Sequence, residues 1–267
     1  MTAIALRMTG ADLLKLRRKR WLVLLSLFLT LGVLLIIYAV TVIEHASNPA
    51  KPGVQGGYGP AGGTDHFSDG IRVLALFFGP LVAILIGIEA GTGDASAGVF
   101  RDLVVTGRSR LALFASRVPA ALALCWAVML LAYALILLAT FVFAGGLPTP
   151  DGALIFNGLG FMLLSTGVLC AIAVGFASFT TSRAGAIVTL IAWQIVASPL
   201  IVMIKSLGSG RRAILSQAIV HFSPVHVGEG GHGATVTMSG SVAFIVLVAW
   251  VVVFLGLGAW RTRTMDT

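Results

Sequence analysis

Six long runs of apolar residues, separated by polar stretches, divide the chain. An α-helix rises about 1.5 Å per residue and a bilayer core is roughly 30 Å thick, so each run is long enough to cross a membrane. The pattern predicts an all-α integral membrane protein in which residues 21–267 form a single transmembrane domain. The six spans are expected near residues 21–43, 71–89, 117–143, 153–178, 185–204 and 242–260.

Residues 1–20 precede the first span and have a moderately amphipathic pattern. On a helical wheel, apolar and basic side chains fall on opposite sides, with Ala3, Leu6, Leu13 and Leu16 facing away from Arg7, Lys15, Arg18 and Lys19. This pattern predicts an interfacial helix that lies on the membrane with its basic face toward anionic headgroups. The alternative is a frayed basic tail.

The composition agrees with a membrane protein. The 267 residues are 58% hydrophobic and 10% charged, with a mean hydropathy of +1.00, whereas a soluble domain has about 25% charged residues. The net charge of +8 does not predict nucleic acid as a partner, because the basic residues lie in short loops beside apolar runs and there set membrane orientation. Most of the 18 Lys and Arg residues lie on the N-terminal side, which predicts that both termini are cytoplasmic.

One long polar segment, Glu89–Arg117, lies between spans on that side. Its pattern predicts a short amphipathic helix, because Phe100, Leu103, Val104 and Gly107 share one helical face. Candidate N-caps are Thr92, Asp94 and Ser96, and Ser109 can cap a second helix that leads into the third span. The segment is either a docking surface or a solvated loop that follows the positive-inside bias.

Two segments are expected on the opposite side, at residues 44–70 and 205–241. The first is rich in Gly and Pro and is expected to be a flexible loop without regular structure. The second contains apolar residues at helical spacing, which predicts a short amphipathic or re-entrant helix near residues 214–222. It also contains His221, His226, Glu229 and His232, which are weak candidates for a metal site because their spacing matches no zinc pattern.

Small residues recur every four positions in spans two and four. Such stripes let helix backbones approach closely, either inside one chain or at a subunit interface. The candidate packing or dimer-interface residues are Gly79, Ala83, Gly87, Gly167 and Gly175. Pro80 is expected to kink span two, and Pro199 to kink or end span five.

Several chemistries have no signal in the sequence. No ionisable residue lies near the middle of a span, which disfavours a proton- or ion-driven pump. Neither a GxxxxGK[ST] phosphate loop nor an HExxH metalloprotease motif occurs, so we expect a subunit without its own catalytic centre.

The layout resembles an ABC-2 type transporter permease, the membrane subunit of an ABC exporter (type V exporter-like). The resemblance covers the topology of essentially the whole chain. In sequence it is concentrated in an acid that closes span two, followed by a GxxRxLxxxGxSR run at residues 98–110. Many family members have Thr at the position of Val99, and their acid lies closer to the run, so either Glu89 or Asp94 is the matching acid.

The resemblance implies a bacterial plasma-membrane transporter in which two permease subunits, identical or related, pair with two cytoplasmic ATPases. It implies no cofactor in this chain, with ATP and Mg bound by the partner ATPase, and it makes residues 90–116 the coupling loop. The implied coupling residues are Glu89, Asp94, Phe100, Arg101, Asp102, Leu103, Arg108 and Arg110. Charge-free spans suggest a hydrophobic or lipid-like cargo. The alternatives are a membrane enzyme or metal-dependent factor that uses the histidines, and a non-transporting membrane anchor.

Overall fold

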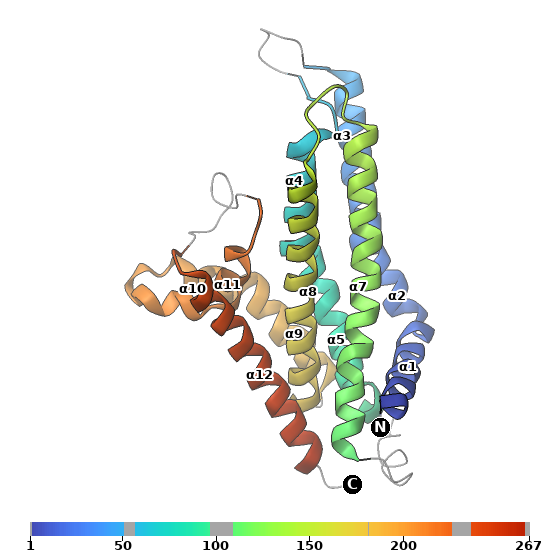
Figure 1. Ribbon diagram of the computed structural model, residues 1–267, viewed down its shortest axis with the longest axis vertical. Coiled ribbons are helices and arrows are strands. Elements are labelled where there is room, and N and C mark those ends of the chain that lie inside the picture. Colours follow the sequence, from blue (N-terminus) through green and yellow to red (C-terminus); the bar gives the residue numbers. More distant parts are fainter. Residues whose placement is uncertain (1, 51–56, 97–108, 181, 226–235, 265–267) are drawn as a thin grey trace.

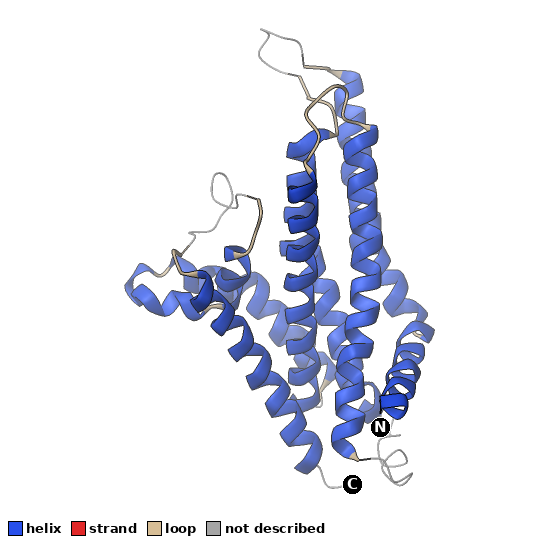
Figure 2. Cartoon of the chain, in the orientation of Figure 1, coloured by secondary structure: helices blue, strands red, loops and turns tan. Residues whose placement is uncertain are grey.

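The computed structural model describes residues 2–50, 57–96, 109–180, 182–225 and 236–264 of the protein. Within these ranges the chain forms helices and no strand (Figure 1, Figure 2). Six helical segments are long and apolar enough to cross a membrane, which confirms the prediction of an all-α membrane protein with six spans. They are Arg20–Ser47, Gly63–Gly93, Arg110–Val142, Gly152–Thr180, Arg183–Met203 and Gly240–Thr264.

Three of the spans are continuous α-helices, namely α7 (Arg110–Val142), α8 (Gly152–Thr180) and α12 (Gly240–Thr264). Each of the other three contains a five-residue π-helical turn. Span one is α2 (Arg20–Leu27), η1 (Phe28–Gly32) and α3 (Val33–Ser47). Span two is α4 (Gly63–Val73), η2 (Leu74–Phe78) and α5 (Gly79–Ser96). Span five is α9 (Arg183–Ala192), η3 (Trp193–Ala197) and α10 (Ser198–Met203).

Two of the π-turns lie just before a proline. Proline has no N–H and its ring clashes with the carbonyl group four residues earlier. The turns η2 and η3 end two residues before Pro80 and Pro199, so each widened turn absorbs the missing hydrogen bond. Pro199 therefore does not end its helix, because α10 continues to Met203.

The long helices separate into two groups. Figure 1 shows α3, α4, α7 and α8 as a tall bundle, while α9, α10, α11 (Leu215–His221) and α12 lean away on one side. Both chain termini lie at the same end of the molecule, which we call the terminal end. The 33 residues of α7 make it about 50 Å long, so it reaches well beyond the level of α10 and α11 (Figure 1).

The predicted small residues pack helices against one another within the chain. A Cβ atom on Gly87 would lie 2.6 Å from the carbonyl oxygen of Cys170 in α8, and one on Gly175 would lie 2.3 Å from the carbonyl oxygen of Phe254 in α12. A Cβ atom on Gly167 would lie 3.1 Å from the Trp126 ring. All five predicted residues are buried: Gly79, Ala83, Gly87, Gly167 and Gly175. The structure thus places them in contacts inside one chain.

The segment 44–70 is more ordered than its composition suggested. In the described part, α3 continues to Ser47, the backbone N–H of Ala50 donates to the Tyr58 carbonyl oxygen at 3.0 Å, and α4 begins at Gly63. The prediction of a loop without regular structure is therefore wrong for α4. The reason is burial: Phe67 on α4 is 0% exposed, so one face of this polar-looking helix belongs to the core.

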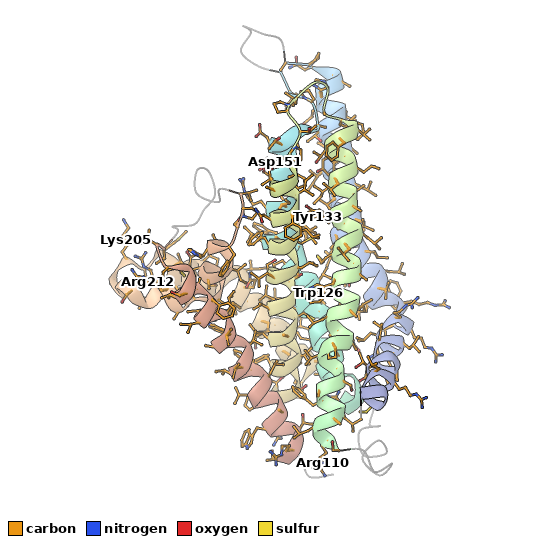
Figure 3. The ribbon with its side chains drawn as sticks, in the orientation of Figure 1. Arg110, Trp126, Tyr133, Asp151, Lys205 and Arg212 are labelled. Carbon is orange, nitrogen blue, oxygen red and sulfur yellow. The ribbon has the colours of Figure 1, made fainter. Side chains whose placement is uncertain are left out.

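The described part of residues 205–241 contains the predicted short helix. It is α11, which buries Leu215, Ala218 and Ile219 and leaves His221 exposed. A 3₁₀ segment, η4 (Lys205–Ala213), precedes it, and its Lys205 and Arg212 side chains project away from the bundle (Figure 3).

Candidate functional site

The carboxylate of Glu89 is the centre of a charged cluster near the terminal end. Only 3% of this side chain is exposed, and its two oxygens pair with cations from two other parts of the chain. Lys19 Nζ donates to Oε1, and Arg183 Nη2 lies 2.9 Å from Oε2. A carboxylate is costly to bury unless it is paired, and these two contacts offset that cost.

The two cations each lie at the beginning of a membrane span. Lys19 is the single residue between α1 (Thr2–Arg18) and α2. Arg183 is the first residue of α9, whose N-terminus is capped by Ser182, because its Oγ accepts from the N–H of Gly185 at 3.2 Å. The ion pairs therefore join the beginnings of spans one and five to the end of span two.

The carbonyl oxygen of Gly91 connects two further spans to the same end of α5. Arg117 Nη1 on α7 donates to it at 3.2 Å, and Ser178 Oγ on α8 donates to it at 3.3 Å. Arg117 and Ser178 are each 5% exposed. Five of the six spans thus meet through polar contacts around the last turns of α5.

The N-terminal helix is held against the bundle. Ser116 Oγ on α7 donates to Asp12 Oδ2 at 2.6 Å, and Leu16 is buried with 4% exposure. The prediction of a helix before the first span is confirmed, and the alternative of a frayed tail is wrong for the described residues. Leu6 and Leu14 remain exposed at 72% and 54%, so part of the apolar face is left uncovered by this chain.

The structure tests only part of the predicted coupling set. Glu89 lies at the centre of the cluster. Arg110 is the first residue of α7, at the terminal end (Figure 3), and its Nη1 donates to the carbonyl oxygen of Arg263 at 3.3 Å. Asp94 lies within α5, but its side chain is outside the described set. The remaining predicted residues also lie outside the described residues: Phe100, Arg101, Asp102, Leu103 and Arg108.

The predicted caps have different outcomes. Ser109 caps α7 as expected, because its Oγ accepts from the N–H of Ala112 at 3.2 Å. Thr92 is not an N-cap: α5 runs through it to Ser96, and its hydroxyl donates to the Ile88 carbonyl oxygen one turn earlier, at 2.8 Å. Thr92 is 1% exposed, so this turn of α5 lies inside the packed bundle and not at the beginning of a helix.

The sequence pattern placed Lys19 on the basic face of the N-terminal helix and Arg117 at the end of the polar segment, but it did not identify Lys19, Arg183 or Arg117 as partners of the end of span two. A usable signal was present. An acid at the end of an apolar run needs a cation if it is buried, and these basic residues lie at the ends of other runs on the same side. Which cation it meets depends on the packing of helices distant in sequence.

The histidine candidates are only partly described. His221 is exposed on α11 and its ring lies edge-on to Phe222, with centroids 5.4 Å apart. His226, Glu229 and His232 lie outside the described residues. The described part of the chain contains no group of three or more His, Cys, Asp or Glu residues that could hold a metal ion.

No protein-family model matches the chain, and no curated protein matches it. The geometry itself defines a class of site. A buried carboxylate and a buried backbone carbonyl group near the end of α5 bind three cations and one hydroxyl group, which come from the ends of the four spans one, three, four and five. Such an arrangement of ion pairs and hydrogen bonds holds the ends of these helices in register.

Proposed function

We propose that the chain is the membrane subunit of an ATP-driven ABC-2 type exporter, placed in a bacterial plasma membrane with both termini in the cytoplasm. A separate ATPase would contact the segment between α5 and α7 and drive two such subunits. The observation that carries the proposal is the ion-paired Glu89, which joins the end of α5 to Lys19 and to Arg183.

The coupling segment is connected to most of the spans through the contacts at the end of α5. In the sequence, the coupling segment follows α5, which carries Glu89 and Gly91, and precedes α7, whose N-cap is Ser109. A push on that segment acts on the ends of α5 and α7, and the cluster distributes it to α1, α8 and α9. Packed helices shift between discrete arrangements, so a small displacement at this end can change the spacing of the spans.

The amphipathic pattern of residues 100–107 supports the same proposal. Phe100 and Leu103 would enter an apolar groove on the ATPase, while Arg101 and Asp102 would pair with charges at its rim. Rim charges determine register and partner choice more than affinity. The cargo would be hydrophobic or amphipathic, because no span carries an ionisable residue near its middle.

The test is a charge reversal in the coupling segment. We expect the protein purified from its native membrane to retain an ATPase, and the double variant Arg101→Glu with Asp102→Arg to lose that partner and its ATP-dependent transport while remaining folded. The matched control reverses two exposed charges, Arg212→Glu and Asp65→Arg, on segments away from the terminal end and should keep both properties. Transport by the isolated protein that survives ATP depletion would contradict the proposal.

A further inference from the structure

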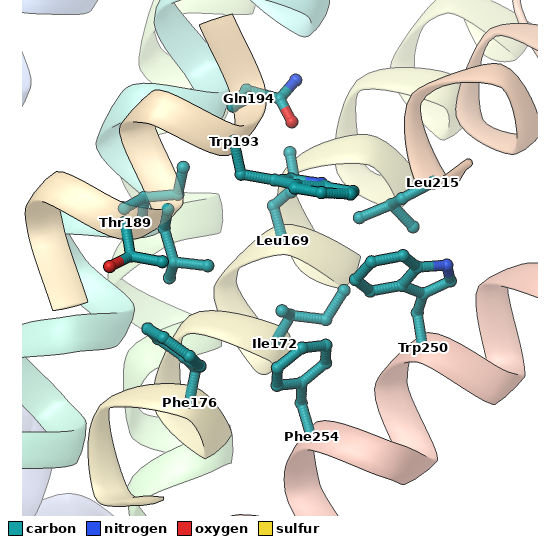
Figure 4. Close-up of a pocket in the computed structure, with 11 residues that line it drawn as sticks. Leu169, Ile172, Phe176, Thr189, Trp193, Gln194, Leu215, Trp250 and Phe254 are labelled. Carbon is teal, nitrogen blue, oxygen red and sulfur yellow. The ribbon is translucent and has the colours of Figure 1, made fainter. Parts of the chain in front are cut away.

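A partly open apolar cavity of about 190 Å³ lies on the side of the molecule away from α1. Its walls come from five parts of the chain, namely α5, α8, the α9–η3 segment, α11 and α12 (Figure 4). The principal lining residues are Ile172, Phe176, Leu190, Trp193, Trp250 and Phe254. Because α9 and α12 both pack on α8, the cavity fills the wedge between two membrane spans.

Aromatic rings form one side of the cavity. Trp250 stacks on Phe254 with centroids 5.5 Å apart and lies 5.7 Å from Trp193 across the wedge. The Trp250 Nε1–H donates to the carbonyl oxygen of Ala213 at 2.9 Å, which fixes the orientation of the ring. These contacts make the wall preformed, so a ligand would not have to order it on binding.

The floor and the opposite wall are aliphatic or aromatic as well. Phe176 lies edge-on to Phe254 at 5.8 Å, and Ile172 is 2% exposed. Trp193 and Gln194 are consecutive residues of the π-turn η3, and both line the space. Gln194 lies at its upper edge in Figure 4, with its amide clear of the ring-lined centre.

The chemistry of the walls restricts the occupant. Buried water needs two to four polar partners, and almost no polar atom faces this space. Apolar cavities of about 150 Å³ stay dry and accept ligands as large as benzene. A polar or charged group has no partner inside, so only the hydrocarbon part of a molecule fits, with its polar part left outside the wedge.

We infer that this cavity is a binding site for one hydrocarbon chain of an amphipathic lipid. The chain enters between α9 and α12 from the surrounding bilayer and packs against Trp193, Trp250 and Phe254. The inference does not rest on the proposed function, because it requires neither an ATPase nor transport.

The test uses the purified protein in nanodiscs of saturated phosphatidylcholine that contain a small fraction of phosphatidylcholine with a photoreactive diazirine in mid-chain. After irradiation, labelled residues are mapped by peptide mass spectrometry at rising probe fractions. We expect labelling of Trp193, Trp250 and Phe254 to saturate at one probe per protein. Labelling at Leu35 and Ile36, which are exposed on α3, should instead rise in proportion to the probe. Cavity labelling that also rises in proportion would overturn the inference, as would absent labelling in a protein that retains no lipid.

A filling variant provides the matched comparison. Thr189 lines the cavity and is exposed, so Thr189→Phe adds a ring to the empty space with little disturbance of the core. We expect at least about a tenfold loss of saturable labelling, equivalent to roughly 1.4 kcal/mol of binding free energy. Val188→Phe adds the same ring one residue away at a position that does not line the cavity, and it should leave the labelling unchanged. If Thr189→Phe does not fold, Leu169→Phe fills the space from α8 and must give the same loss.

The same preparation distinguishes the two sources of the chain. A lipid that remains at one per protein after repeated delipidation, and that blocks the probe, is a resident lipid. A probe that enters within minutes and is displaced by added unlabelled phosphatidylcholine identifies an exchangeable ligand. Either result supports the site. If the protein retains no lipid and the probe labelling does not saturate, the site is refuted.

Discussion

Arg183 Nη2 lies 2.9 Å from Glu89 Oε2, so the first residue of α9 is fastened to the end of α5 by an ion pair in which the carboxylate is almost fully buried. The same carboxylate binds Lys19 at the beginning of span one. The two cations are 43% and 58% exposed, whereas Glu89 is 3% exposed. The acid is therefore the member of the cluster that depends most on its partners.

Glu89→Gln should lower the free energy of unfolding by about 1.5 kcal/mol. Contacts to a charged group contribute about 1.5–3 kcal/mol, and water partly replaces the carboxylate around the two exposed cations, which favours the lower value. Unfolding in mixed micelles measures the change. Glu44→Gln near the end of α3 is the control, because its carboxylate forms no ion pair within the described residues. Equal free energies of unfolding for both variants would show that the Glu89 ion pairs do not stabilise the fold.

Gly87→Ala should destabilise the contact between α5 and α8 by about 1–3 kcal/mol, the usual cost of forcing an extra methyl group into a packed core. The added Cβ would lie 2.6 Å from the Cys170 carbonyl oxygen, so the two backbones must separate. Gly160→Ala on α8 is the matched control, since its Cβ would meet nothing within 4 Å, and its helix should gain up to about 1 kcal/mol. Thermal unfolding of both variants gives the comparison, and a neutral Gly87→Ala would contradict the close approach.

Asp12→Ala should release α1 from α7. The variant loses the 2.6 Å hydrogen bond from Ser116 Oγ, leaving that hydroxyl group partly buried without the carboxylate. Loss of a charged acceptor should make amide hydrogen exchange in α1 at least about tenfold faster. Thr9→Ala, on the same helix, is the control. If the two variants exchange alike, burial of apolar residues such as Leu16 is sufficient to hold α1.

Ser109→Ala should cost about 1 kcal/mol at the first turn of α7, because the N–H of Ala112 loses its side-chain acceptor. We expect faster hydrogen exchange at residues 110–113 and little change at the other end of the helix. Ser68→Ala, inside α4, removes a hydroxyl group that caps no helix and should leave α7 unaffected. Unchanged exchange at the first turn of α7 would show that other contacts, such as the Arg110 bond to Arg263, hold this end.

The six spans could be predicted because a membrane span is a property of local composition. About 20 apolar residues are sufficient to specify it, whatever packs beside it. The Ser109 cap and α11 could be predicted for the same reason, since a cap and a helical face involve only neighbouring residues. The helix α4 was not predicted because its neighbouring sequence is rich in glycine, which indicates a loop. What stabilises the helix is the burial of Phe67 against residues that are distant in the sequence.

The sequence by itself determined that the chain has six segments long and apolar enough to cross a membrane, that small residues recur along span two, and that an acid closes that span. The tertiary structure decided which partners these residues meet: Gly87 faces Cys170, and Glu89 binds Lys19 and Arg183. It also decided that Trp193 and Trp250 border an apolar cavity. The physical reason is that hydropathy and capping act over a few residues, whereas ion pairs and cavities arise only where helices distant in the sequence pack together.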